Sequence, residues 1–308
     1  MLFVSGVVTR IGRFLIAATL WTGRGVPAQA QDSLRLGAPS GLQLLVDEHN
    51  TAPTLRVVLP GRPASDSSIK VLFPEHVTAV RHGDADGQRL YLWEPGTRAH
   101  RPVWRRLRNA LEYERDLPGS VRVVARATLD SDGVLFRYEF RNGSATAYDM
   151  IYAVTDPRLT SLFHDVRLER TYVHYASGLE LLGAETPARL TVPLEQWLPA
   201  RYLASFTWPV PPQRVERRED GITYYHTTRR VDEPFIATVS SDTAWVVASF
   251  TRSTGNVWSN PALTCQHVDP QTALPPGATA VTEIKLLVVR GSLRSAFQQM
   301  LLQRHLLH

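Results

Sequence analysis

The sequence predicts an all-β protein, a large antiparallel β-sandwich with a short C-terminal helix. Short runs rich in β-branched and aromatic residues recur between turn-forming residues along most of the 308-residue chain. This spacing is typical of sandwiches and barrels. One pair of runs has the pattern of a hairpin, and only the last segment repeats its apolar residues at helical spacing. Since neither an internal repeat nor a linker interrupts the pattern, we expect a single domain over residues 31–308.

Residues 1–30 have the composition of a secretory signal peptide. Arg10 and Arg13 precede an apolar run at 14–21, and the small residues Ala28 and Ala30 flank a cleavage site. The apolar run is too short to span a bilayer, although an N-terminal anchor or a core helix is the alternative. We therefore expect a periplasmic or secreted protein, with no membrane span once the signal peptide has been removed.

The clearest strands form a hairpin at 120–129 and 134–141, with the turn Asp130 to Gly133 between them. Arg137, Glu139 and Arg141 alternate with apolar residues, which predicts one solvated face. The next strand is expected at 147–154, and Asp156 ends it in a position to cap one helical turn. The earlier strands are expected at 42–46, 54–59, 69–73, 77–80 and 88–93.

In the second half of the chain, strands are expected at 171–174, 179–182, 189–193, 214–219, 222–229, 236–239 and 244–251. A final strand at 280–289 leads into the one predicted helix, at 292–306. Ser292 is placed to cap it, and Leu293, Phe297, Met300 or Leu301, and Leu306 recur on one face.

Charge and cysteine content exclude several classes of protein. Without the three arginines of residues 1–30, the chain keeps 31 of its 34 basic residues against 29 acidic ones. Basic clusters are interleaved with acids, so no concentrated basic face for nucleic acid is expected. Cys265 is the only cysteine, so an intramolecular disulfide is impossible. Phosphate-loop, dinucleotide and cysteine-based zinc motifs are absent. We therefore predict no cofactor and no metal, and the oligomeric state stays open.

The stretch 255–277 is the first candidate site. Strand patterns flank it, and loops of this length are often functional. Trp258 beside Asn260 suits the stacking and hydrogen bonding of a sugar ring, although a tryptophan can equally cap the end of a sandwich. His267 and Asp269 could exchange protons with a substrate, while Cys265 is expected to pack as a small apolar residue.

A second candidate cluster lies at 163–175. Tyr172 and His174 would share one face of a strand and join His267 and Asp269 as catalytic groups. Arg170 and His164 would bind substrate beside Trp258 and Asn260. The alternative is a solvated loop whose histidines have partners within the fold. The histidines could also ligate a metal, but no helical His-x-x-x-His spacing supports this.

Two strings resemble galactose mutarotase-like supersandwich proteins over about residues 120–290. They are VLFRYEFRNGSATAYDMIYAV and LTCQHVDPQTALPPGATAVTEIKLLVV. The resemblance implies a β-supersandwich with a sugar site on its concave face, where a histidine acts as general acid and a glutamate as general base. This chain has Gln266 and His267 where the glutamate is expected, and Asp269 is the nearest acid. Gln266 cannot take a proton, which argues against ordinary mutarotase chemistry.

The sequence thus predicts an exported carbohydrate-binding or carbohydrate-processing protein. If it is an enzyme, acid–base chemistry of the epimerase, lyase or hydrolase type is expected. The alternatives are a non-catalytic periplasmic β-sandwich that binds a protein partner or a cell-wall polymer, and a metal-dependent hydrolase. His267→Ala is expected to abolish activity with little effect on the melting temperature.

Overall fold

A computed structural model describes residues 34–48, 50–63, 68–90 and 101–308. The chain divides into two units, Met1–Ser33 and Leu34–His308, and only the second is described. The predicted signal peptide therefore lies outside the described residues, as does the end of the strand predicted at 88–93. Within the described ranges, no helix is long and apolar enough to cross a membrane.

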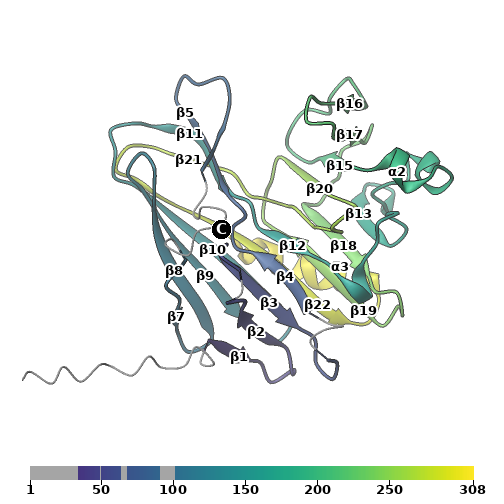
Figure 1. Cartoon of the computed structure of the whole chain (residues 1–308), viewed down its shortest axis with the longest axis horizontal. Coiled ribbons are helices and arrows are strands. Elements are labelled where there is room, and N and C mark those ends of the chain that lie inside the picture. Colours follow the sequence, from purple (N-terminus) through teal and green to yellow (C-terminus); the bar gives the residue numbers. More distant parts are fainter. Residues whose placement is uncertain (1–33, 49, 64–67, 91–100) are drawn as a thin grey trace, which may run out of the picture. The chain divides into compact units, whose positions relative to one another are not determined.

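A large sheet of nine strands runs across the described unit, from β7 and β8 on the left of Figure 1 to β18 and β13 on the right. Its strands follow the order β14-β13-β18-β19-β22-β10-β9-β8-β7, all paired antiparallel. Their bounds are β7 Arg105–Arg106, β8 Ala110–Leu117, β9 Val121–Leu129, β10 Gly133–Asn142, β13 Thr171–Tyr175, β14 Gly178–Leu181, β18 Phe235–Val239, β19 Trp245–Phe250 and β22 Thr279–Arg290.

A second sheet contributes to the same apolar core, in the order β1-β2-β3-β4-β12. Its strands are β1 Arg35–Gly37, β2 Gln43–Val46, β3 Thr54–Val58, β4 Ser68–Leu72 and β12 Asp156–Arg158. Phe73, just after β4, contacts Phe136 of β10 with ring centroids 5.0 Å apart, and its carbonyl accepts a hydrogen bond from the Tyr113 hydroxyl. Aromatic side chains thus hold the two sheets together.

The helix α3 (Leu293–Gln303) packs on strands of the large sheet and is followed by the 3₁₀ turn η4 (Arg304–Leu306). Ser292 caps it as predicted, its hydroxyl accepting a hydrogen bond from the Ser295 N–H at 3.2 Å. Met300 is buried against β18, β19 and β22. Of the two alternatives Met300 and Leu301, Met300 therefore faces the core, whereas Leu306 is exposed and the predicted apolar face was wrong there.

Two four-stranded sheets complete the unit and lie on either side in Figure 1. One has the order β21-β11-β5-β6, and the other β16-β17-β15-β20. The only parallel pairing given for the described strands joins β15 to β17. The bounds are β5 Val77–Arg81, β6 Gln88–Leu90, β11 Tyr148–Ala153, β15 Ala200–Ser205, β16 Val215–Arg217, β17 Thr223–His226, β20 Asn256–Ser259 and β21 Thr272–Leu274. Three short helical segments are η2 Ser161–Phe163, η3 Pro187–Leu190 and α2 Leu194–Trp197.

The all-β prediction with large antiparallel sheets and a C-terminal helix is confirmed, including the hairpin of β9 and β10. The strand predicted at 189–193 was wrong. Arg189 is buried and donates to the carbonyls of Arg167 and Thr186 at 2.8 and 3.0 Å, which holds this segment in turns. Asp156 starts β12 rather than a helical turn, because Asp156–Arg158 pairs with β4.

Candidate functional site

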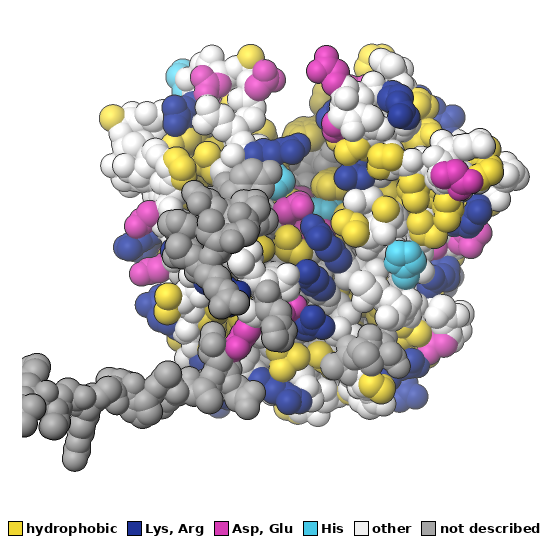
Figure 2. All heavy atoms as spheres, viewed as in Figure 1, with side chains coloured by type: hydrophobic (Ala, Val, Ile, Leu, Met, Phe, Trp, Pro, Cys, Tyr) yellow, Lys and Arg dark blue, Asp and Glu magenta, His cyan; other side chains and the backbone are white. Residues whose placement is uncertain are grey.

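The two four-stranded sheets enclose a cavity of about 490 Å³. Figure 2 shows the surface hollowed between them, with basic, acidic and histidine side chains exposed in the hollow. Strands β5, β6 and β11 form one wall, and β15, β17 and β20 form the other. The lining side chains with chemical function are Tyr152, Tyr224 and Trp258, the acid–base groups Glu75, His76, Asp220 and Asp269, and the arginines Arg89, Arg201 and Arg218.

Trp258 joins this cavity to a buried charged cluster beneath it. Its ring stacks on that of His267, with centroids 3.7 Å apart and planes 4° from parallel. The backbones of the two residues exchange hydrogen bonds of 3.0 Å in both directions, which fixes the stack. His267 covers one face of the indole, so the cavity meets the opposite face or the edge.

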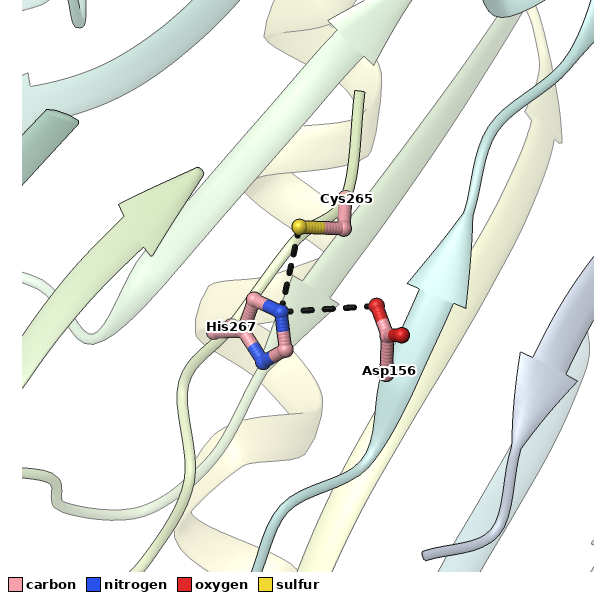
Figure 3. Close-up of side chains that lie close together, drawn as sticks. All are labelled: Asp156, Cys265 and His267. Carbon is pink, nitrogen blue, oxygen red and sulfur yellow. Dashed lines mark hydrogen bonds and ion pairs between the residues drawn. The ribbon is translucent and has the colours of Figure 1, made fainter. Parts of the chain in front are cut away.

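His267 lies between two carboxylates. Its Nε2 is 3.4 Å from Asp156 Oδ1 and 3.1 Å from Cys265 Sγ, and its Nδ1 is 3.4 Å from Asp269 Oδ2 (Figure 3 draws the first two). Both contacts between His267 and a carboxylate are ion pairs without a hydrogen bond. Asp156 Oδ1 in the first contact and His267 Nδ1 in the second have no hydrogen-bond partner among the described residues. Asp156 is also paired with Arg158 Nε at 2.5 Å.

Burial and charge set the protonation of this cluster. Burial raises the pKa of the Cys265 thiol, so the sulfur stays neutral. Burial alone would lower the pKa of His267, but the interactions of its ring with the carboxylates of Asp156 and Asp269 raise that pKa well above its usual value. Burial raises the pKa of Asp269 against the opposing effect of His267. The arrangement is a buried imidazolium between two acids.

Glu75 and His76 are site residues that the sequence prediction missed. Both line the cavity, just before β5. Burial and the charge of Asp156 raise the pKa of Glu75, whose Oε1 lies 3.2 Å from Arg158 Nη2. Burial and Arg89 lower the pKa of His76 to about 4, so its ring is neutral at neutral pH. The adjacent acid and histidine at the start of a strand were the available signal.

Asp156, Cys265 and His267 could also hold a metal ion. One donor atom from each lies within 4.8 Å of the others, and a nitrogen, a sulfur and an oxygen suit zinc. Asp269 on Nδ1 would direct Nε2 toward that ion. None of these three donor residues is among those that line the cavity, so such an ion would stabilise the fold rather than contact a ligand there.

The predicted site residues fall into two groups. Trp258 and Asp269 line the cavity, and His267 is buried between them, stacked on Trp258. Asn260 is buried near them, where its carbonyl oxygen Oδ1 accepts from the Ala262 N–H at 3.2 Å and its own N–H donates to Cys265 Sγ at 3.2 Å. Asn260 therefore shapes the turn after β20.

The other four predicted residues do not line the cavity. His174, on β13, has its Nδ1 2.6 Å from Asp232 and its ring stacked on Phe297 of α3, with centroids 4.1 Å apart. Tyr172 precedes it by two residues on the same strand. Arg170 donates to the backbone carbonyls of Val239, at 2.7 Å, and of His164, the residue that follows η2.

Comparisons with known proteins give structural matches alone. No protein-family model and no curated protein matches the sequence. Solved structures similar to this chain include a galactose mutarotase related enzyme from Lactobacillus acidophilus, with 8% identity over 82% of this chain and 95% of that one, and a TM-score of 0.46. A galactose mutarotase-like protein from Lactobacillus casei has 10% identity over 80% and 97%, with a TM-score of 0.44.

The alpha-N-acetylgalactosaminidase NagBb from Bifidobacterium bifidum is also similar, with 10% identity over 85% of this chain and 37% of that one, and a TM-score of 0.47. Several of the similar structures are thus galactose mutarotase-like proteins, the group that the two sequence strings resemble. At this degree of similarity they say nothing of the ligand of this chain.

Proposed function

We propose that this protein binds a carbohydrate in the cavity between the two four-stranded sheets. The observation that carries the proposal is the indole of Trp258, fixed on His267 and presented to a cavity with ionisable and hydroxyl-bearing side chains. A sugar offers an apolar ring face for an aromatic side chain and hydroxyls for polar neighbours. A volume of about 490 Å³ is in the range of small-ligand sites.

The same cavity has groups for acid–base chemistry on the bound sugar. The raised pKa of Glu75 brings its proton exchange closer to neutral pH, and the neutral ring of His76 can accept a proton. Glu75 Oε2 lies 3.8 Å from His76 Nδ1, so both can act on one region of a ligand. We propose Glu75 as the principal proton-transfer group, in a reaction of the epimerase, lyase or hydrolase type.

The binding test is isothermal titration calorimetry after a saccharide-array screen. Trp258→Ala is expected to weaken the best saccharide at least about tenfold, as loss of a central aromatic contact does. Trp258→Phe keeps a ring on His267 and should retain most of the affinity. Tyr172→Ala is the control, since Tyr172 lies outside the cavity. If Tyr172→Ala weakens binding and Trp258→Ala does not, the ligand binds at β13 and the proposal is wrong.

Turnover is tested separately from binding. Glu75→Gln should keep affinity within a few-fold and remove any conversion of the bound saccharide, because an amide cannot exchange a proton in this role. Unchanged conversion in Glu75→Gln would assign the chemistry to another group.

We also propose that the protein is exported, on the basis of residues 1–30. Expression of the full chain in a Gram-negative host should yield a periplasmic product that begins near Gln31, identified by intact mass. A cytoplasmic product with its N-terminus intact would contradict export.

A protein partner or a wall polymer is the second candidate, favoured by three exposed leucines of α3 and η4. Leu301, Leu302 and Leu306 are 43%, 71% and 69% exposed. Leu302→Asp should then abolish pull-down of the partner without changing saccharide affinity.

A further inference from the structure

The cavity has arginines on both walls. Arg89 belongs to β6 in one sheet and Arg201 to β15 in the other, while Arg218 lies beyond β16. Arg218 pairs with Glu216 at 3.1 Å and lies over the Tyr224 ring, so its charge is compensated within its own hairpin. The charges of Arg89 and Arg201 are not compensated in this way.

The carboxylates that line the cavity do not neutralise Arg89 and Arg201, because they have other partners. Glu75 has its cation in Arg158, at 3.2 Å, and Asp269 has His267, at 3.4 Å. Asp220 is exposed and accepts a hydrogen bond from the Ile222 N–H at 2.9 Å. Two of the three lining carboxylates are therefore paired with cations that are not themselves lining residues.

Arg89 and Arg201 have no such partner in the described part of the chain, where no carboxylate lies within 4.0 Å of either guanidinium. Among the described residues, the guanidinium of Arg201 donates a hydrogen bond to the carbonyl of Ala200 alone, at 2.9 Å. The charge of Arg89 reaches the cavity, since it helps to lower the pKa of His76 and acts on Tyr152. The cavity thus has two guanidinium groups whose charge is uncompensated by the described residues.

We propose that the saccharide bound here is acidic, and that its anionic groups are held by Arg89 and Arg201 while its ring contacts Trp258. This inference rests on the proposed carbohydrate function and names its substrate class. A guanidinium binds a carboxylate, sulfate or phosphate through two parallel hydrogen bonds, and such charge-assisted bonds are stronger than neutral ones. Uronic acids, sulfated sugars and sugar phosphates share this chemistry.

The test is calorimetry with five probes on the full mature chain: digalacturonate, its methyl ester, a sulfated disaccharide, glucose 6-phosphate and inorganic sulfate. At least one acidic probe should bind about tenfold or more tightly than the neutral ester, and its affinity should fall as salt rises. Which acidic probe binds best identifies the source of the anionic group.

The variants are Arg89→Gln and Arg201→Gln, with Arg294→Gln on α3 as the matched control because Arg294 is exposed and outside the cavity. Each cavity variant should weaken the acidic probe about tenfold and leave the neutral ester within twofold. The control should change neither, and unchanged melting temperatures exclude misfolding.

The outcomes separate this inference from the function on which it rests. A neutral ester that binds as tightly as the acidic probes overturns the inference and leaves carbohydrate binding intact. Inorganic sulfate that binds as tightly as the acidic saccharides also overturns it, since the sugar ring would then contribute nothing. If no saccharide binds, carbohydrate binding itself fails.

Discussion

Trp258 owes its orientation to His267, on whose ring it stacks with centroids 3.7 Å apart, and His267 in turn lies between the carboxylates of Asp156 and Asp269. The sequence alone shows that a tryptophan, the cysteine, a histidine and an aspartate lie close together at 255–277. Burial was not visible, because it depends on contacts with Asp156, which is more than a hundred positions away in the chain. For the same reason Glu75 and His76 were missed.

Complete burial changes the expectation for His267→Ala, which the sequence alone assigned little effect on stability. The substitution removes the cation between two buried carboxylates; Asp156 keeps Arg158, whereas Asp269 loses the one cation that contacts it among the described residues. Breaking a buried ion pair typically costs about 3–5 kcal/mol. Urea denaturation of His267→Ala should show a loss of this order.

The control for that measurement is His82→Ala. The side chain of His82 is 76% exposed and contacts Asp149, so its loss should change the free energy of unfolding by less than about 0.5 kcal/mol. Equal effects of the two substitutions would show that the buried pairs do not stabilise the fold.

His76 gives stability a defined dependence on acid pH. Its folded-state pKa is about 4, below the unfolded value near 6.5, so acid favours the unfolded chain, which binds the proton more readily. The contribution of His76 is therefore present above about pH 6.5 and is lost as pH falls toward 4. The free energy of unfolding should decline less between pH 7 and 5 in His76→Gln than in the wild type. Parallel declines would contradict the lowered pKa.

At the scale of elements, strands whose apolar and polar residues alternate could be predicted from the sequence. A strand whose apolar residues are interrupted by acidic residues could not. The hairpin of β9 and β10 was found because apolar and polar residues alternate in it. Strand β8 was missed because Glu112, Glu114 and Asp116 interrupt its apolar residues, although Glu112 is buried against Arg105 and Arg126. Strand β20, which forms part of the cavity wall, was missed because it lies in the stretch 255–277, which was expected to be a loop.

Among the glycines that the structure describes, Gly133 of this hairpin has the closest approach of another backbone. A Cβ on Gly133 would lie 2.0 Å from the carbonyl oxygen of Leu286, so Gly133→Ala must displace β10 from β22. We expect a loss of about 2 kcal/mol or more in the free energy of unfolding. Gly37→Ala on β1, where a Cβ meets nothing within 4 Å, is the control and should have little effect. Normal stability of Gly133→Ala would show that the two strands can separate without loss.

At the scale of the whole molecule, the fold class could be predicted from local sequence patterns. The position of the cavity could not. The cavity combines segments near residues 75–89, 150–154, 201–224 and 258–269. No local periodicity encodes their meeting, which depends on sheet order and on the parallel pairing of β15 with β17. Sequence patterns therefore predicted four of the six wall strands, β5, β6, β11 and β17, and missed β15 and β20.

The single-domain prediction has a direct test. A chain that begins at Gln31 contains every described residue, so it should unfold in one cooperative transition and bind saccharide as the processed full-length protein does. Differential scanning calorimetry measures the transition. Two separated transitions would show that residues 31–308 form more than one cooperative unit.

The parallel stack of Trp258 on His267 allows the site to be followed by tryptophan fluorescence. An imidazolium in face contact with an indole accepts an electron from its excited state, so Trp258 should be quenched while His267 carries its proton. The chain has seven tryptophans, and the difference between the emission of the wild type and that of Trp258→Phe isolates this one. A molecule that enters the cavity, or a change in the charge of the buried ring, would then appear as a change in brightness at a single position.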